Sequence, residues 1–485
     1  MSRWSAAKLI ALSLALSLVS TMANALPAFA RQTGQNCVAC HAGGQFPELT
    51  PYGRMFKLTG YTFGERTAVP ISVMGVGSYA KVRDTSKSDD PSADFQKNGS
   101  LIFATGSVFV AGKVTDNIGV FVQNTYDNYA SQSDSGRFKG HSQTDNMDFR
   151  YADRFIGNDR DLIMGVSVNN NPSVSDPWNS AAAWMQYVPG ASPTSHQFVD
   201  GPYPGFGAGS NLAGVSFYGY LNETIYAELG LYRTANQALS FMSAGIPDDD
   251  TTKLGGTNPY WRFAYTRAWG AHNIMLGTSG MVAHVFDAGS DISDSNNRGR
   301  FKNTGIDAQY QYLLDPHTVT AQLAYMRQTQ NYSANTIAGA ASPFFLADGV
   351  TPVAAANSSD TTNSLRAKLS YVYQAKYGGS VSFFNVTGTT NTLNQSSGFD
   401  STGLITSTDP NGTGITSTRV NGNLSGNPAT RGFTYEAFWT PVQYVRVGAQ
   451  YTAYNKFNGA STNYDGFGRD ARDNNTLRLY IWAAY

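Results

Sequence analysis

Hydrophobic and polar positions alternate one by one in many short segments from about residue 69 to the end of the chain. In one of them Ile118, Val120 and Val122 occupy every second position. That spacing is the period of a β-strand, whose successive side chains point to opposite faces. A short turn at 115–117 joins this segment to another alternating one at 101–114. The pair predicts a β-hairpin with a tight connection.

The same unit recurs, with a short turn inside each pair and long connections rich in Asp, Ser, Asn and Gly between pairs. An opening strand at 71–81 and a closing one at 477–485 bring the predicted total to sixteen. An even strand number, with short turns alternating with long loops, is typical of outer-membrane β-barrels. The other six hairpins are predicted at 147–155 with 162–170, 212–221 with 225–233, 260–268 with 274–285, 305–313 with 318–327, 365–373 with 379–387, and 433–439 with 444–454.

The alternation also predicts the two faces of the barrel. In the closing strand Leu477, Leu479 and Ile481 fall on one side, which we assign to lipid. An Arg or Lys on that side at mid-membrane costs about 2–4 kcal/mol, so polar side chains should face the lumen. A barrel of about this strand number encloses a channel and not a packed core. The predicted lumen residues are Asp307, Gln309, Gln311, Arg366, Lys368, Ser370, Arg446 and Gln450.

Composition agrees with an all-β chain, since Tyr, Phe, Gly, Asn, Ser and Thr dominate. Lys and Arg together number 34, and so do Asp and Glu, which leaves no basic patch for a nucleic acid. After the amino terminus no apolar run approaches 20 residues, so no membrane-spanning helix is expected. A soluble β-sandwich or propeller is the alternative to an outer-membrane barrel.

Residues 1–25 have the pattern of a secretory signal peptide. Arg3 and Lys8 give a positive start, residues 9–19 an apolar core, and Ala23 and Ala25 a small-residue cleavage site. The chain is therefore expected to be exported. It divides into this signal, a short segment at 26–68 and the barrel domain at 69–485.

The segment 26–68 carries the chain's only two cysteines, in Cys37-Val38-Ala39-Cys40-His41. Two thiols separated by two residues and followed by His are the pattern of c-type haem attachment. Each Cys forms a thioether to a porphyrin vinyl group, and His41 becomes an axial ligand of the iron. The alternatives are a thioredoxin-like redox pair, a structural disulfide or chance. We therefore predict one covalently bound haem c and a monohaem cytochrome c segment at 26–68.

A short helix should follow the attachment motif. Thr50 can cap its amino end, Pro51 suits the first helical position, and Gly60 can end it. Residues 52, 55, 56 and 59 then share one face, suited to a porphyrin edge. So small a module can scarcely bury a haem alone. We expect it to plug the lumen, with both chain termini in the periplasm and the long loops outside the cell.

The remaining haem contacts are predicted less directly. Met55 is the nearest methionine downstream of His41 and a candidate second axial ligand, with a lumen ligand or an open position as alternatives. Arg54 and Lys57 are candidates to pair with the haem propionates, or are simply solvated charges. No catalytic residue is predicted beyond the haem.

Other groups offer no clear chemistry. No Ser-His-Asp pattern or H-E-x-x-H motif occurs, and the remaining histidines are scattered, with His141 and His196 expected in long loops. Acidic clusters at 89–90, at 248–250 and at Asp291 with Asp294 could collect cations at the cell surface, or could be ordinary solvated loops.

One resemblance covers the whole architecture and is specific within 29–61. The stretches Phe29-Ala30-Arg31-Gln32-Thr33-Gly34, Cys37-Val38-Ala39-Cys40-His41 and residues 47–57, followed by a barrel of this size, resemble the fused monohaem cytochrome–porins of iron-oxidising bacteria. The length and the haem segment look most like members from acidophilic iron oxidisers. The resemblance implies an outer-membrane cytochrome, an iron(II) oxidoreductase, that takes electrons from extracellular Fe(II). It implies that periplasmic carriers, a blue copper protein or a soluble c-type cytochrome, receive them.

Cys37, Cys40 and His41 are the residues that the resemblance carries over. Two other functions stay open. The chain could be a porin for small solutes with a structural or sensory haem, or an electron conduit with another donor or direction.

Overall fold

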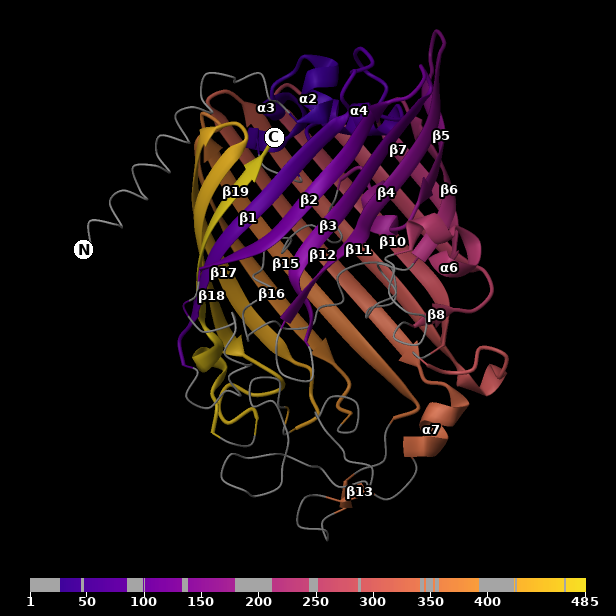
Figure 1. Cartoon of the computed structure of the whole chain (residues 1–485), viewed down its shortest axis with the longest axis vertical. Coiled ribbons are helices and arrows are strands. Elements are labelled where there is room, and N and C mark those ends of the chain that lie inside the picture. Colours follow the sequence, from indigo (N-terminus) through magenta and orange to yellow (C-terminus); the bar gives the residue numbers. More distant parts are fainter. Residues whose placement is uncertain are drawn as a thin grey trace, which may run out of the picture.

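A closed antiparallel β-barrel of sixteen strands dominates the computed structural model (Figure 1). The structure describes residues 27–44, 48–84, 99, 101–132, 138–178, 212–243, 252–286, 289–340, 344–345, 352–353, 357–391, 423, 425–465 and 468–485. The predicted signal peptide at 1–25 lies outside these residues. The two-residue strand β8 (Lys253–Leu254) pairs with the end of β10 beyond its pairing with β9, so it extends the row of β9 and adds no separate strand to the circle.

The barrel strands are β1 (Ile71–Val82), β2 (Leu101–Lys113), β3 (Ile118–Gln132), β4 (Phe138–Ile156), β5 (Asp161–Asn169), β6 (Leu212–Leu221), β7 (Ile225–Thr234), β9 (Asn258–Trp269), β10 (His272–Phe286), β11 (Arg298–Leu314), β12 (His317–Asn331), β15 (Ser359–Tyr373), β16 (Tyr377–Gly388), β17 (Thr430–Val442), β18 (Val445–Lys456) and β19 (Thr476–Ala484). Two short strands, β13 (Phe344–Phe345) and β14 (Pro352–Val353), pair only with each other.

Each barrel strand pairs with its neighbours in chain order, and the first strand closes the circle with the last. β1 pairs on one edge with β2 and on the other with β19, where Met74 lies opposite Ala484 and Val82 opposite Thr476. Closure removes the free edges that a lipid environment cannot satisfy. The predicted strand number and fold class are confirmed.

The helices before β1 are α2 (Ala28–Thr33), α3 (Cys37–Cys40), the 3₁₀ turn η2 (Ala42–Gly44) and α4 (Pro51–Leu58). None of the described helices is long and apolar enough to cross a lipid bilayer. The helices in the connections are α5 (Pro172–Ser175), α6 (Ala235–Ala238), η4 (Ser240–Met242), η6 (Ser295–Asn297), α7 (Ala334–Ala340) and η7 (Ala471–Asn474).

Several strands run further toward the long connections than the alternation indicated. β4 begins at Phe138, nine residues before the predicted start at Met147. The added stretch is polar at nearly every position, so no apolar period marks it as a strand. His141 therefore lies in β4, and its prediction as a loop residue was wrong. His196 lies outside the described residues.

The outer and inner faces follow the predicted alternation. Leu479 and Ile481 expose 45% and 49% of their surface, while the intervening Tyr480 is buried. On the lumen side Gln309, Gln311, Arg366 and Ser370 are among the buried polar residues. An apolar outer belt around a closed barrel with a polar interior defines an outer-membrane protein.

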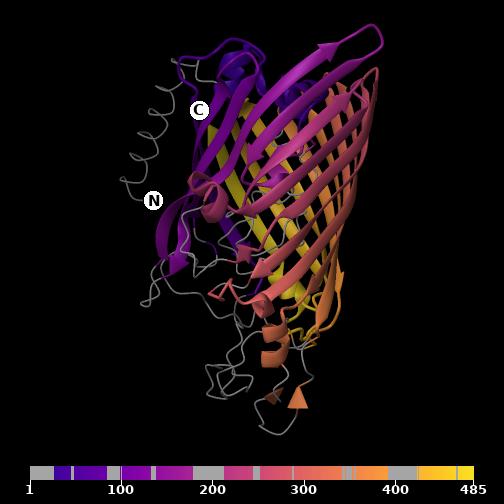
Figure 2. The ribbon, with the colours of Figure 1, turned by 90° about the vertical axis from the view of Figure 1, so that its right-hand side faces the viewer.

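The two ends of the barrel differ. The short turns and the carboxyl terminus lie at one end, together with helices α2–α4, and helix α7 and strand β13 lie at the other (Figures 1 and 2). Two of the short turns have consecutive residues at positive φ, as type I′ hairpins require: Asn222 with Glu223, and Gln374 with Ala375. We call this the short-turn end.

Candidate haem-attachment site

The attachment motif folds as a single helical turn. Cys37 and Cys40 are the ends of α3, and the His41 amide donates to the Cys37 carbonyl at 2.8 Å. Residues three apart on a helix lie on the same side, so the two thiols face one region. Both cysteines are free, which leaves the disulfide alternative without support. Two free thiols on one turn fit the two vinyl groups of a haem.

His41 leaves the helix in extended conformation, and its backbone bridges to Leu49. Burial lowers the pKa of the His41 imidazole to about 3, so the ring is neutral at ordinary pH. The neutral imidazole is the form that binds a metal. Burial also raises the pKa of Cys40 to about 11, which keeps this sulfur as a thiol. The donor set therefore fits a c-type haem in its chemistry.

Helix α4 packs directly against this turn. Thr50 caps the helix as predicted, because its hydroxyl accepts from the Gly53 amide at 3.1 Å, and it also donates to the Ala39 carbonyl. A Cβ on Gly53 would lie only 2.2 Å from the Cys40 carbonyl oxygen. Gly60, at φ 76°, ends the helical region as predicted. The predicted helix is confirmed, and glycine at position 53 lets it approach the motif.

An aromatic cluster forms the core of the segment. Phe56 packs against Phe29 with ring centroids 4.8 Å apart, and Phe29 stacks on Tyr61 at 5.2 Å. Phe29 also reaches Phe121 of the barrel wall, at 6.2 Å. Phe56, predicted to face the porphyrin, therefore packs within the aromatic cluster of the segment. Tyr52 on the same helix is 38% exposed.

The two cations of α4 reach across the lumen to the wall. Arg54 donates to the Leu49 carbonyl at 2.7 Å, to Gln311 at 3.1 Å and to Asn273 at 2.5 Å. Lys57 donates to the Asp176 carbonyl at 2.9 Å. Both side chains are buried, and these contacts anchor α4 to the barrel. Their pairing with propionates stays a prediction.

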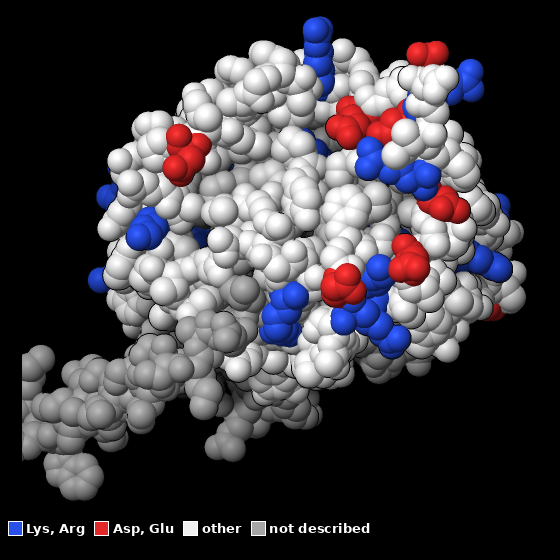
Figure 3. Space-filling model, turned by 90° about the horizontal axis from the view of Figure 1, so that it is seen from above, with Lys and Arg blue, Asp and Glu red and all other residues white. Residues whose placement is uncertain are grey.

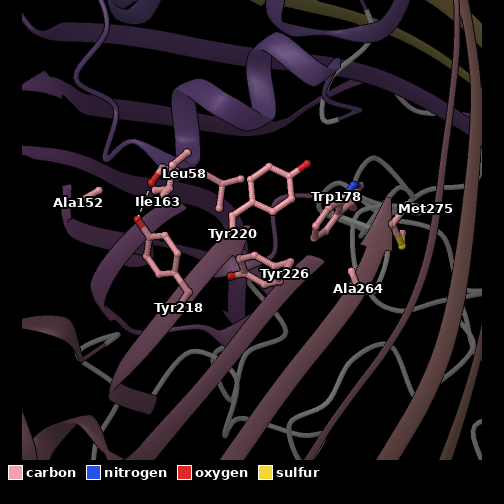
Figure 4. Close-up of a cluster of buried hydrophobic side chains, with 9 residues drawn as sticks. All are labelled: Leu58, Ala152, Ile163, Trp178, Tyr218, Tyr220, Tyr226, Ala264 and Met275. Atoms are coloured by element: carbon pink, nitrogen blue, oxygen red, sulfur yellow. Dashed lines mark hydrogen bonds between the residues drawn. The ribbon is translucent and has the colours of Figure 1, made fainter. Parts of the chain in front are cut away.

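Below α4 lies a buried cluster of wall side chains (Figure 4). The Tyr218 hydroxyl donates to the Leu58 carbonyl at 2.7 Å. Met55 packs against this cluster, and its role as second axial ligand stays a prediction. The cluster joins the plug to six strands, β4, β5, β6, β7, β9 and β10, and to the segment after α5: Leu58, Ala152, Ile163, Trp178, Tyr218, Tyr220, Tyr226, Ala264 and Met275.

A buried ionic group, which the sequence analysis missed, completes this anchor. Asp148 accepts from Tyr61 at 2.6 Å, from Arg150 at 2.6 Å and from Ser167 at 2.6 Å. The Arg150 guanidinium also lies 5.2 Å from the ring centroid of Tyr218. Asp148 and Arg150 are two positions apart on β4, so their side chains lie on the same face of the strand. That spacing could have predicted a pair of opposite charges in the lumen.

On the opposite side of the mouth the attachment loop itself meets the wall. The Cys37 amide donates to Gln443 in the turn after β17 at 3.2 Å, and Glu48 pairs with Lys368 of β15 at 2.6 Å. A Cβ on Gly43 would lie 2.9 Å from Val372, also on β15. Residues 27–44 and 48–68 therefore span the mouth of the barrel, and we call the segment 27–68 the plug.

The outer surface of the short-turn end carries charges of both signs around a largely uncharged face (Figure 3). Two ion pairs at the strand ends beside the turns contribute to it: Lys113 with Asp116 at 2.8 Å, and Arg154 with Asp161 at 2.5 Å. No single sign dominates the described part of this face.

Among the described residues, no group of three or more His, Cys, Asp or Glu side chains could hold a metal ion. Asp291 and Asp294 accept hydrogen bonds from the backbone of their own loop, at Ser293 and Asn296. The acidic clusters at 89–90 and 248–250 lie outside the described residues.

No protein-family model matches the chain, and no curated protein matches it. Among solved structures, OmpF of Salmonella typhi in complex with daunomycin is 10% identical, with 86% of this chain and 97% of that chain covered at a TM-score of 0.42. The outer membrane channel DcaP of Acinetobacter baumannii is 12% identical, with 87% and 99% covered at 0.39. OmpT of Vibrio cholerae in trimer form is 10% identical, with 86% and 98% covered at 0.39. The strand pairing described above, and not these similarities, defines the chain as a porin-like outer-membrane β-barrel with a plug at its short-turn end.

Proposed function

We propose that this protein is an outer-membrane c-type cytochrome that oxidises extracellular Fe(II) and passes the electrons to periplasmic carriers. The observation that supports it is the attachment turn at Cys37–Cys40, set with a buried neutral His41 on a plug inside the barrel mouth. A passive pore has no need of two free thiols and an adjacent imidazole in that place. The proposal extends to membership of the fused cytochrome–porins that residues 29–61 resemble.

The proposed orientation follows the usual asymmetry of such barrels. Short turns of outer-membrane barrels face the periplasm and long loops face outward. The plug and both ends of the barrel domain then lie on the periplasmic side, where a blue copper protein or soluble cytochrome can reach them. Fe(II) enters from the long-loop side.

Each residue of the site has a defined part. The Cys37 and Cys40 sulfurs hold the haem through thioethers, and the neutral His41 ring is available to its iron. When bound, the haem supplies reversible one-electron chemistry. One Fe(II) becomes Fe(III) for each electron passed to the carrier. The barrel wall keeps lipid away from this path, since its apolar belt is about 25 Å tall.

The direct test mixes the purified, haem-loaded protein with Fe(II) at acidic pH and follows the haem absorption bands. We expect Fe(II) to produce the reduced spectrum that dithionite produces. Reduction by dithionite but not by Fe(II) would remove iron oxidation and leave a haem with another donor or another role. A His41→Ala variant should lose the low-spin spectrum while keeping covalent haem.

A second function, passage of small solutes, is favoured by the sixteen-stranded wall with its polar inner face. Reconstituted protein in planar bilayers tests it. A steady open conductance in the haem-loaded protein, together with no reduction by Fe(II), would favour a porin.

A further inference from the structure

A row of cations lies on the outer wall of the barrel at the end opposite the plug, where helix α7 is seen (Figure 1). Arg298, Arg300 and Lys302 occupy every second position of β11, so their side chains lie on one face of the strand. Ile306 lies on the same face and exposes 62% of its surface, which identifies this face as the outer one. The three cations therefore point away from the lumen, and all three are exposed.

A fourth cation joins them from the neighbouring strand. In the pairing of β11 with β12, Arg327 lies opposite Thr304, and Thr329 lies opposite Lys302. Arg327 and Lys302 are therefore diagonal neighbours, about 7–8 Å apart in the sheet. Arg327 is exposed on the outer face as well. We call these four side chains the outer cationic patch: Arg298, Arg300, Lys302 and Arg327.

The height of the patch on the wall places it at a membrane boundary. Near the short turns, Tyr310 and Tyr312 of the same outer face lie 6.0 and 5.2 Å from the ring centroid of His272. Aromatic side chains of this kind line the interfaces of outer-membrane barrels. Lys302 is ten residues from Tyr312, which is about 33 Å along a strand and about 25 Å in height at a tilt of about 40°. An apolar belt has this height, so the patch begins at the headgroups of the other leaflet.

No carboxylate forms an ion pair with the patch within the described part of the chain. Asp291 and Asp294, in the loop before the patch, accept hydrogen bonds from amides of that loop. Asp307, the next carboxylate along β11, lies on the lumen side and pairs with Arg262. Like charges placed side by side on a sheet repel one another. An anion from outside the chain is therefore needed to balance the patch.

We propose that the outer cationic patch binds a lipid whose headgroup carries two phosphate monoesters. A phosphate monoester has a charge of about −1.5 to −2 at pH 7, so two of them balance four cations, whereas a diester phospholipid supplies a single charge. Guanidinium groups bind phosphate bidentately, and long cationic side chains extend from apolar surface to the headgroups. The patch also continues the lipid-facing belt of Ile306 and Leu323. In the orientation proposed above this lipid belongs to the outer leaflet, and the haem plays no part in the inference.

The test titrates the full-length protein, in neutral detergent micelles at pH 7, with diphosphoryl lipid A. Native mass spectrometry counts the bound lipid. The variant Arg298→Gln/Arg300→Gln/Lys302→Gln should bind at least about tenfold more weakly than the wild type, since each contact to a charged group is worth about a factor of ten or more. The charge-conserving variant Arg298→Lys/Arg300→Lys/Lys302→Arg should bind within about threefold of the wild type.

Arg431→Gln is the control for a single charge, because Arg431 is an exposed arginine on β17 at the same end of the barrel. It should change the affinity less than Arg300→Gln does. Retarded gel mobility of the unheated barrel establishes folding, and if the triple Gln variant does not fold, Arg300→Gln and Arg327→Gln decide the outcome.

Wild-type affinity in the folded Gln variants would overturn the inference. Equal affinity of the wild-type protein for phosphatidylglycerol would show that the patch does not select a bisphosphorylated headgroup and would also overturn it. Inorganic phosphate that binds as tightly as the lipid would assign the patch to a soluble anion instead. Reduction of the haem by Fe(II) should be the same in all variants, so failure of this inference leaves the proposed function standing, and the reverse holds as well.

Discussion

Gly53 shows how far one residue decides the geometry of the site. Helix α4 crosses the attachment turn so closely that a Cβ at this position would lie 2.2 Å from the Cys40 carbonyl oxygen. In an open helix, Gly→Ala is favourable by about 0.5–1 kcal/mol. With alanine at position 53, helix α4 would instead have to move away from the Cys40 backbone. Overpacking of this kind costs about 1–3 kcal/mol. Whether Gly53→Ala stabilises or destabilises the protein is therefore decided by the attachment turn that lies against helix α4.

We predict that Gly53→Ala leaves the barrel folded and lowers the yield of covalent haem. Haem stain per barrel, after denaturing electrophoresis, measures the yield. Gly219→Ala is the matched control, because the nearest atom to its Cβ would be the Ile163 carbonyl at 3.9 Å. Equal haem stain in the two variants would show that α4 tolerates a shift at this crossing.

The arrangement of residues whose contacts lie within a few positions along the chain could be predicted from the sequence. Thr50 caps a residue three positions on, and Cys37, Cys40 and His41 share one turn, so their arrangement could be predicted. Arg54 could not be placed in this way. Its partner Asn273 is 219 residues away, and only barrel closure brings the two together.

At the scale of elements, the plug depends on buried charge. Asp148, on β4, receives hydrogen bonds from Tyr61 of the plug and from Arg150 and Ser167 of the wall. Removing one partner of a buried ion pair leaves an uncompensated charge and costs about 3–5 kcal/mol. Removing one neutral donor costs about 1 kcal/mol. Loss of the Asp148–Arg150 ion pair should therefore loosen the plug more than loss of the hydrogen bond from Tyr61 to Asp148.

We predict that Arg150→Met loosens the plug far more than Tyr61→Phe. Limited proteolysis of the detergent-solubilised protein, followed at residues 27–68, measures the difference. The barrel's heat-dependent gel mobility reports separately on the wall. Cleavage of Arg150→Met at the wild-type rate would mean that the aromatic cluster around Phe29 holds the plug without the ion pair.

Element boundaries were predictable where one face is apolar and not where both are polar. The alternation marks β19 from Leu477 onward, because each outward side chain meets lipid. It misses the start of β4, where residues 141–146 are all polar and strand pairing alone defines the element.

At the scale of the whole molecule, the outer belt determines whether the barrel can stay in the membrane. Leu479 points outward near the middle of β19, and Leu101 points outward at the far end of β2, with 81% of its surface exposed. We predict that Leu479→Arg destabilises the barrel by about 2–4 kcal/mol and Leu101→Arg by about 0–1 kcal/mol. Urea unfolding in lipid vesicles measures both. Equal effects would mean that the membrane is not centred on the middle of β19.

The plug and the wall should be separable, because the barrel closes through β1 and β19 and not through the plug. Without residues 27–68, polar wall groups such as Gln311 and Asn273 would face water, which they tolerate. We predict that this deletion still yields a folded barrel and raises ion conductance in planar bilayers at least tenfold. Full-length Cys37→Ser/Cys40→Ser keeps the plug but cannot attach haem, and it should stay as closed as the wild type. If that variant conducts as freely as the deletion, the haem and not the polypeptide plug closes the mouth. Equal conductance in all three proteins would place the barrier in the long connections at the other end.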